Sequence, residues 1–320
     1  MTYYDERQLK MSDKINKKLE EFPEYMYSFF HLKRSKITSN VAISCIGNFL
    51  KWLIENKKIS KEKISDIEIE DFESVTIDTM LQYFEWLRLQ NSEETVRSKI
   101  ICIRKFWNYL VRRGVSSHID NQDFKDLLSK YKQSPTEVIV PEKEDLDKFL
   151  NNLYARKSNF GTFRDITIVE LFLGSGIRLS ELIGLNVDDI DFDNHTLRIT
   201  AKGNINREVK ITDRAEKYLE DYLRRRDAVK SKTNALFLSN RGERMSATAI
   251  QSFFKKYSDG VLHPHLLRHY VASVMANDER GGYLQAKEQL GHRSVKTTES
   301  YYIKVDRDRV RSSLNSVWNG

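Results

Sequence analysis

The chain has 320 residues, and its 53 lysines and arginines outnumber 46 aspartates and glutamates, giving a net charge of +7 and a pI near 9.1. This length exceeds the usual size of a single core and favours two domains, while 40% hydrophobic residues exclude a disordered chain. No apolar run approaches the roughly 18 residues that span a bilayer, and MTYYDERQLK is no signal peptide. The basic excess favours a polyanionic partner, and without a spanning apolar run no membrane is expected.

The first 133 residues are predicted to form a helical domain. Within residues 37–58 and again within residues 91–114, apolar side chains recur with the i, i+3, i+4, i+7 spacing of an amphipathic helix. These side chains are Ile46, Phe49, Leu50 and Leu53 in the first helix and Ile103, Phe106, Trp107 and Leu110 in the second. Asn91 or Ser92 is suited to cap the second helix, and Gly114 to end it.

Two other features of this half bear on function. The remaining faces of the second helix are basic, and they carry Arg97, Arg104, Lys105, Arg112 and Arg113. By itself such a face is most often simply solvated. The two cysteines, Cys45 and Cys102, have no metal-ligand spacing and are expected to be small core residues in a reducing cytoplasm.

A linker is predicted where the helical periodicity fails. Pro135 and Pro141 interrupt the stretch between Tyr131 and Leu146. We therefore expect a helical first domain of residues 1–133, a linker of residues 134–141 and a second domain of residues 142–320. Two domains joined in this way are able to close around a duplex as a clamp.

The second domain is expected to be mainly α-helical with a small antiparallel β-sheet, an α+β arrangement. Residues 191–200 and 207–211 alternate apolar and polar side chains, and between them lies a turn with Gly203 and Asn204 at its tip. Helices are expected over residues 166–173, 178–185, 216–226 and 265–278. The segment SGIRLSE is not a phosphate-binding P-loop, because it lacks the paired glycines and the Gly-Lys-Ser/Thr ending.

Basic and histidine side chains of this domain precede a tyrosine pair. They are Arg178, Lys202, His265, Arg268 and His292, followed by Tyr301–Tyr302, in FLGSGIRLSELIGL, AKGNINREV, HPHLLRHYVASVM and LGHRSVKTTESYY. A phosphodiester that is held by cations and attacked by a tyrosine hydroxyl would require all of them. In this order and spacing, the chain resembles the tyrosine recombinases, the superfamily of phage integrases and the Xer and Cre recombinases. The resemblance is strong from about residue 142 to the end and looser before it.

Arginine suits phosphate because its planar fork makes bidentate contacts and stays charged. Arg178 follows the turn Gly174-Ser175-Gly176, at an expected helix N-terminus whose amides also favour an anion. His265 and Arg268 stand three residues apart on a helix that Pro264 can open, so both reach the same side. Each of these patterns also occurs by chance in many helices.

The resemblance assigns roles to further residues. Lys202 matches the hairpin lysine that protonates the leaving 5′ oxygen, whereas Lys210 in the following strand fits less well. Tyr301, nine residues after His292, matches the nucleophile, and its neighbour Tyr302 is expected to be structural.

Glu181 matches an acidic partner that orients Arg178 or a histidine; the plainer alternative is a surface ion pair worth a few tenths of a kcal/mol. Arg207, in the same hairpin as Lys202, is expected to bind DNA without a catalytic role.

The resemblance also implies the partners. We expect strand exchange through 3′-phosphotyrosyl intermediates and a Holliday junction, by a homotetramer on double-stranded DNA with paired inverted-repeat arms, in the bacterial cytoplasm at the nucleoid. The basic face of residues 91–114 would contact that DNA.

An apolar stripe in the tail is expected to dock in a neighbouring subunit or on its own domain. Its members are Val310, Leu314, Val317 and Trp318.

No cofactor is expected. Two arginines and a lysine supply the positive charge that Mg²⁺ provides elsewhere, and no carboxylate cluster or Cys/His spacing is suited to hold a metal. Two alternatives remain: a type IB topoisomerase, which shares this chemistry but reseals the same strand, and a non-catalytic DNA-binding protein. The sequence leaves open whether the biological role is chromosome dimer resolution, cointegrate resolution, or integration and excision of a mobile element.

Overall fold

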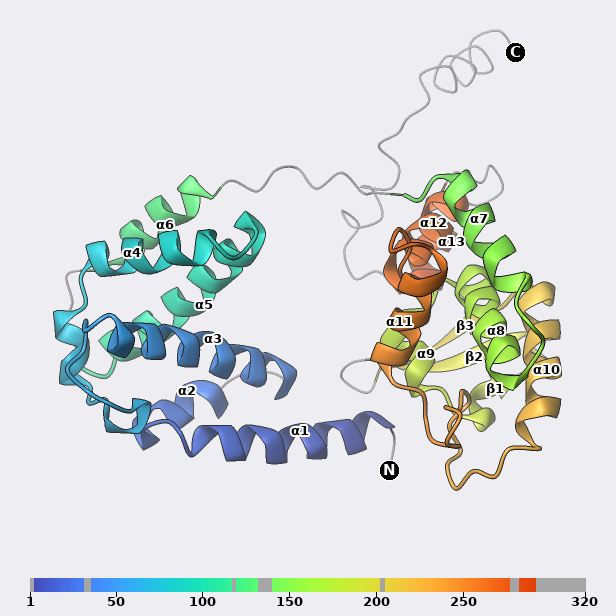
Figure 1. Cartoon of the computed structure of the whole chain (residues 1–320), viewed down its shortest axis with the longest axis horizontal. Helices are drawn as coiled ribbons and strands as arrows, with labels where there is room; N and C mark the ends of the chain where they lie inside the picture. Colours follow the sequence, from blue (N-terminus) through green and yellow to red (C-terminus); the bar gives the residue numbers. More distant parts are fainter. Residues whose placement is uncertain are drawn as a thin grey trace, which may run out of the picture. The chain divides into compact units, whose positions relative to one another are not determined.

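The computed structural model describes residues 3–31, 36–116, 119–131, 140–201, 205–276 and 282–291. The chain divides into two compact units, Met1–Thr136 and Glu137–Gly320. In the described residues, helices make up most of both units, and the one sheet lies in the second (Figure 1). The predicted class, mainly α with a small antiparallel sheet, is confirmed. Within the same residues, no helix is long and apolar enough to cross a membrane.

The first unit is a bundle of helices. They are α1 (Tyr3–Leu19), α2 (Tyr27–His31), α3 (Lys36–Glu55), α4 (Ile77–Arg88), α5 (Glu93–Val111) and α6 (Asn121–Lys130), with short 3₁₀ helices η1 (Glu24–Met26), η2 (Ile64–Asp66) and η3 (Glu70–Ser74). Both predicted apolar stripes, on α3 and α5, are fully buried in one core. The Ser92 hydroxyl caps α5 by accepting from the Thr95 amide, so the predicted start of this helix is confirmed.

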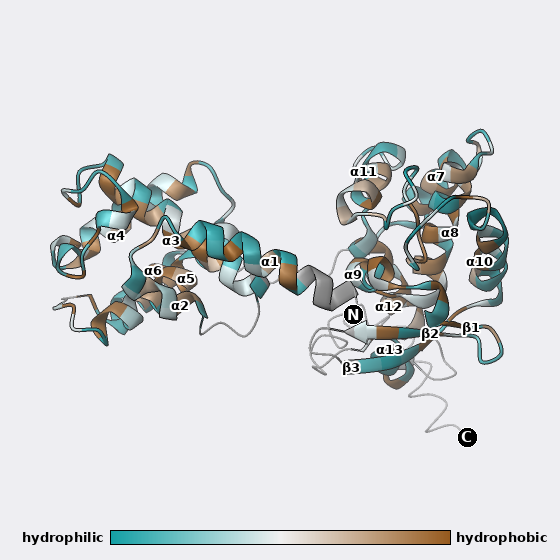
Figure 2. Ribbon diagram, turned by 90° about the horizontal axis from the view of Figure 1, so that it is seen from below, coloured by the Kyte–Doolittle hydropathy of each residue, from teal (hydrophilic) through white to brown (hydrophobic). Residues whose placement is uncertain are grey.

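The second unit surrounds the sheet with helices. They are α7 (Lys143–Tyr154), α8 (Phe160–Ser175), α9 (Leu179–Gly184), α10 (Asp213–Arg226), α11 (Ala247–Tyr257), α12 (Pro264–Ala276) and α13 (Gly282–Leu290), with a short 3₁₀ helix η4 (Val187–Asp189). Helix α8 is buried along most of its length and runs through the middle of the unit, with α10 packed against it (Figure 1). In Figure 2, α10 is mostly hydrophilic in colour, while α8 carries hydrophobic segments.

The sheet has the order β1-β2-β3 and is antiparallel throughout. Strands β2 (Thr196–Ala201) and β3 (Ile205–Lys210) form the predicted hairpin, with Leu197 opposite Val209 and both buried. Residues 191–200 were expected to form a single strand, and this is wrong: β1 (Ile190–Asp191) is separate, and the chain turns back through His195 at a φ of 54°. A strand of two residues is too short to show alternation.

A second expectation, on the residues before Gly176, is wrong because α8 and α10 approach each other closely there. Gly174 and Ser175, predicted to lie in a turn, belong to the last turn of α8, and the chain leaves the helix only at Gly176, with a φ of 67°. A Cβ at Gly174 would lie 2.5 Å from the Thr212 hydroxyl and 2.6 Å from the Ala215 Cβ. Glycine is therefore required here by packing rather than by a turn.

We predict that Gly174→Ala destabilises the second unit by about 1–3 kcal/mol, because the added methyl must displace Thr212 or Ala215. Gly161→Ala, in the first turn of the same helix, is the matched control, since a Cβ there meets its nearest neighbour at 3.4 Å. The control is expected to be neutral or to gain up to ~1 kcal/mol from helix propensity. Urea unfolding followed by far-UV circular dichroism measures both, and equal midpoints for the two variants would contradict the packing argument.

Candidate active site

Arg178 stands at the start of α9, held by a carboxylate of the same helix. It is the N-cap residue in extended conformation, and its backbone amide donates to Glu181 Oε2 at 2.8 Å. Its side chain turns back, so that Nη1 donates to Glu181 Oε1, also at 2.8 Å. The Arg178 amide therefore already serves Glu181, while an anion contact by the other amides at the start of α9 stays a prediction.

Glu181 is more than a surface ion pair. Its side chain is only 4% exposed, and Oε2 also accepts from Arg207 Nη2 at 3.0 Å. Burial alone would raise the pKa of this carboxyl, but the charge of Arg207 and the hydrogen bonds and charge of Arg178 outweigh it, and the pKa lies below its usual value. Glu181 is therefore an ionised carboxylate that fixes two guanidinium groups, one of which reaches the pocket.

Helix α12 brings a second arginine to the same place. The helix begins at Pro264, and His263 Nδ1 accepts from the Leu266 amide at 3.2 Å, which caps its start. One turn later Arg268, 3% exposed, donates to the carbonyls of Gly176 and Leu290. The predicted register of His265 and Arg268 is confirmed, since both side chains line one pocket with Arg178.

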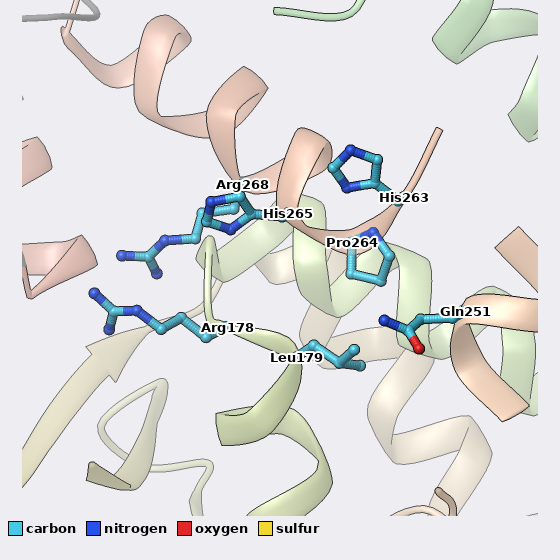
Figure 3. A pocket seen from close by; sticks show the side chains of 7 residues that line it. All are labelled: Arg178, Leu179, Gln251, His263, Pro264, His265 and Arg268. Carbon is cyan, nitrogen blue, oxygen red and sulfur yellow. The ribbon is translucent and has the colours of Figure 1, made fainter. Parts of the chain in front are cut away.

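This pocket is basic. Its lining residues are Arg178, Leu179, Gln251, His263, Pro264, His265 and Arg268. Figure 3 shows the guanidinium groups of Arg178 and Arg268 extending in the same direction from separate elements, with His265 beside Arg268. The arrangement suits a tetrahedral anion better than an extended apolar ligand, because its charged groups are two guanidiniums and its other polar groups are two imidazoles and the Gln251 amide.

The surroundings of His265 favour its neutral form. Burial first, and then electrostatic interaction with His269, Arg268, His263 and Arg178, lower the pKa of its imidazole below the usual value. The His265 and His269 rings meet edge to face, with their centroids 4.4 Å apart. A neutral imidazole in the lining of a cationic pocket is able to accept a proton or to donate a hydrogen bond.

Several predicted residues lie outside the residues that the structure describes. They are Lys202, His292 and Tyr301, together with Tyr302 and the apolar stripe of the tail. Their flanking residues are described: β2 ends at Ala201, β3 begins at Ile205, and Gly291 follows the end of α13. Lys210 Nζ donates to the Asn194 carbonyl at the end of the hairpin away from its tip. Within the described residues, no group of three or more His, Cys, Asp or Glu side chains is arranged to hold a metal ion.

The basic residues of α5 divide into two kinds. Arg97 donates to the carbonyls of Leu128 and Tyr131, at 2.9 and 3.1 Å, and so holds the end of α6. Lys105 and Arg112 are exposed, and Arg104 is half-buried. The contact of these residues with DNA stays a prediction.

Comparison with known proteins decides the family. A model of the phage integrase family matches residues 141–309 of the chain. The tyrosine recombinase XerC of Thermodesulfovibrio yellowstonii is 31% identical over 299 residues, which cover 87% of this chain and 90% of that protein. The chain belongs to the phage integrase family. The XerC of Caldanaerobacter subterraneus is 33% identical over 265 residues, covering 79% of this chain and 71% of that protein.

Solved structures show the fold of this family member. The Tn1549 transposon integrase, in complex with circular intermediate DNA, superposes with a TM-score of 0.69 at 18% identity, covering 91% of this chain and 97% of the other. The XerH site-specific recombinase, bound to a palindromic difH substrate, gives a TM-score of 0.66 at 19% identity, covering 89% and 81%. The predicted tyrosine recombinase fold is confirmed.

The sequence did not predict three polar residues at or next to the pocket. Gln251 of α11 lines it, His263 caps α12, and Gln289 of α13 binds the edge of β3. Arg207 was expected only at the DNA, yet its side chain is 17% exposed and engaged within the protein. Its position could have been inferred, because Arg207 alternates in phase with the buried Val209 and Ile211. A DNA contact for Arg207 stays a prediction.

We predict that Glu181→Gln lowers the stability of the second unit by about 1–3 kcal/mol at neutral pH, since two arginines lose a charged acceptor. The pKa of Glu181 is lower in the folded chain than in the unfolded chain. Its contribution is therefore complete above the usual glutamate pKa and is lost as the pH falls through the folded value. The stability difference between wild type and variant should shrink in acid. Glu208→Gln, at an exposed position of β3, is the control; a difference that is independent of pH would refute the network.

Proposed function

We propose that this chain is a site-specific tyrosine recombinase, which cuts and rejoins DNA through a 3′-phosphotyrosyl intermediate. The observation that carries the proposal is membership of the phage integrase family, with relatives that are tyrosine recombinases. The basic pocket supports it independently, because it brings together the cationic side chains of Arg178 and Arg268, as the binding of a phosphate requires. A type IB topoisomerase shares the chemistry, but the relatives favour recombination.

We assign the phosphate to Arg178 and Arg268. In the transition state, negative charge increases on the nonbridging oxygens, and preorganised guanidinium groups stabilise that charge more than they stabilise the bound substrate. Glu181 supports this assignment, because it fixes the Arg178 side chain before DNA arrives. No metal or other cofactor enters the proposal, so cleavage is expected to proceed in EDTA.

The proton transfers and the attack fall to His265, Lys202, His292 and Tyr301. The Tyr301 oxygen forms a bond to phosphorus while the bond to the 5′ oxygen breaks, and Lys202 gives that oxygen its proton. His265, whose lowered pKa favours the neutral imidazole, is suited to accept the phenol proton; His292 is expected to bind the same phosphate. A free 5′-hydroxyl of another strand reverses these steps, so rejoining needs no ATP.

The first unit is proposed as the DNA-binding domain and the second as the catalytic domain, joined by a linker at residues 134–141. On α5, Arg104 and the exposed Lys105, with the exposed Arg112 just after the helix, suit contacts to the phosphate backbone that carry no sequence information. Arg97 is committed to α6 through its carbonyl contacts. A DNA contact by Arg97 would have to use its remaining nitrogens.

We further propose a homotetramer on two synapsed sites, each with paired inverted-repeat arms. The palindromic substrate of XerH supports this, because a palindrome presents two equivalent arms. The tail helix would dock in a neighbouring subunit and couple the positions of successive tyrosines. The bacterial relatives favour action in the cytoplasm, at the nucleoid. Chromosome dimer resolution, cointegrate resolution and mobile-element exchange are the candidate roles.

The nucleophile provides the test. Tyr301→Phe is expected to abolish covalent protein–DNA adducts on a nicked suicide substrate, because the attacking oxygen is removed, while half-site affinity stays that of wild type. Tyr302→Phe, one residue away, is the matched control and should still form adducts. Denaturing gels of labelled DNA, run with and without EDTA, measure both. Adducts from the Tyr301 variant, together with none from the Tyr302 variant, would overturn the assignment.

A further inference from the structure

The end of α13 is the meeting point of three arginines. Arg207 Nη1 donates to the Gln289 carbonyl at 2.7 Å, Arg268 Nη2 to the Leu290 carbonyl at 2.6 Å, and Arg178 Nη2 to the Gly291 carbonyl at 3.4 Å. These are consecutive carbonyls at the C-terminus of a helix, where the helix dipole presents partial negative charge. Arg178 and Arg268, the two arginines assigned to the phosphate, are therefore both hydrogen-bonded to this helix end.

Gln289 fixes the helix end to the sheet. Its side-chain amide donates to the Lys210 carbonyl at 2.7 Å and to the Ser175 carbonyl at 3.0 Å, while its oxygen accepts from the Lys210 amide at 3.2 Å. One side chain thus joins the end of α13 to the end of β3 and the end of α8. Arg268 donates to the carbonyl of Gly176, just after α8, and to the carbonyl of Leu290, at the end of α13. The contacts of Gln289 therefore fix both backbone segments to which Arg268 is bonded.

Arg207 closes the arrangement from the hairpin. It lies opposite Ile199 on the buried face of the sheet, and it bridges the Gln289 carbonyl and the Glu181 carboxylate. Its side chain covers Gly291, where an added Cβ would lie 2.8 Å from Arg207 Nε. Gly291 also has a φ of 63°, so the chain leaves α13 directly beneath this arginine.

We infer that Arg207 and Gln289 form a clasp, a pair of positioning residues that sets the end of α13 and, through it, the guanidinium groups of Arg178 and Arg268. The inference rests on the proposed function, because it concerns the phosphate that these arginines bind. Neither clasp residue lines the pocket, so the clasp acts through the arginines. Gly291, whose carbonyl belongs to the same arrangement, is the residue that precedes His292 in the sequence.

Gln289→Glu tests the clasp with almost no change in shape. A carboxylate keeps an acceptor for the Lys210 amide, but it cannot donate to the carbonyls of Ser175 and Lys210 and is repelled by them. The single-turnover rate of adduct formation at saturating DNA is expected to fall ~10- to 100-fold, as for small misplacements of reacting groups, with the half-site Kd unchanged. Arg207→Ala should cause a loss of the same order.

Gln285→Glu is the matched control, the same substitution four residues earlier at an exposed position of α13. Its rate should remain that of wild type. If Gln289→Glu cleaves at the wild-type rate, or loses rate and affinity in equal proportion, the clasp is not a positioning device.

A second measurement does not depend on activity. Hydrogen exchange of residues 282–291 should accelerate in Gln289→Glu and not in Gln285→Glu; unchanged protection in both would overturn the clasp. If wild type forms no adduct at all, the proposed function fails, while the exchange result still decides the clasp.

Discussion

The site depends on one buried carboxylate and a set of backbone carbonyls. These groups hold close together guanidinium groups that would otherwise repel one another. Arg178 and Arg207 share the buried Glu181 carboxylate, and Arg178, Arg207 and Arg268 each bind one of three successive carbonyls at the end of α13. Cations that are ordered in this way before a ligand arrives need little reorganisation to stabilise a phosphate. The remaining side-chain exposure, 38% at Arg178, leaves that guanidinium accessible from the pocket.

The fold supplies the backbone positions that this network requires. Gly176 ends α8 at a positive φ, and a Cβ there would lie 2.6 Å from Leu290, so α13 packs directly over the turn that leads to Arg178. Tight contact of α8 with α10 at Gly174 keeps that turn in place. Arg178 and Arg268 lie on different helices, yet both are positioned by hydrogen bonds to the same short stretch of backbone at the end of α13. Small changes in the packing of α13 are therefore expected to move these two guanidinium groups and so to change the rate of DNA cleavage.

Local patterns made much of this predictable. The stripes on α3 and α5, the Ser92 cap and the shared face of His265 and Arg268 depend on residues a few positions apart, and the structure shows each of them. The ordered motif of basic residues and tyrosine predicts the family, and the relatives confirm it.

Other features depend on distant contacts that no local pattern encodes. The sequence places Gly174 in a turn because glycine favours turns, but its partners lie on α10. Gln289 is one uncharged residue whose partners are 79 and 114 positions away. Gln251 reaches the pocket from α11 with no motif around it. Arg207 alone had a usable signal, its alternation with buried strand residues.

The most direct test of the account is a charge-removal experiment at the scissile phosphate. A methylphosphonate at that position replaces a charged nonbridging oxygen with a neutral methyl group, so it removes the charge that Arg178 and Arg268 are proposed to stabilise. Adduct formation by wild type and Arg178→Ala would be compared on phosphodiester and methylphosphonate substrates of the same sequence. We expect the rate loss caused by Arg178→Ala to be large on the phosphodiester and much smaller on the methylphosphonate. The same fold loss on both substrates would contradict it.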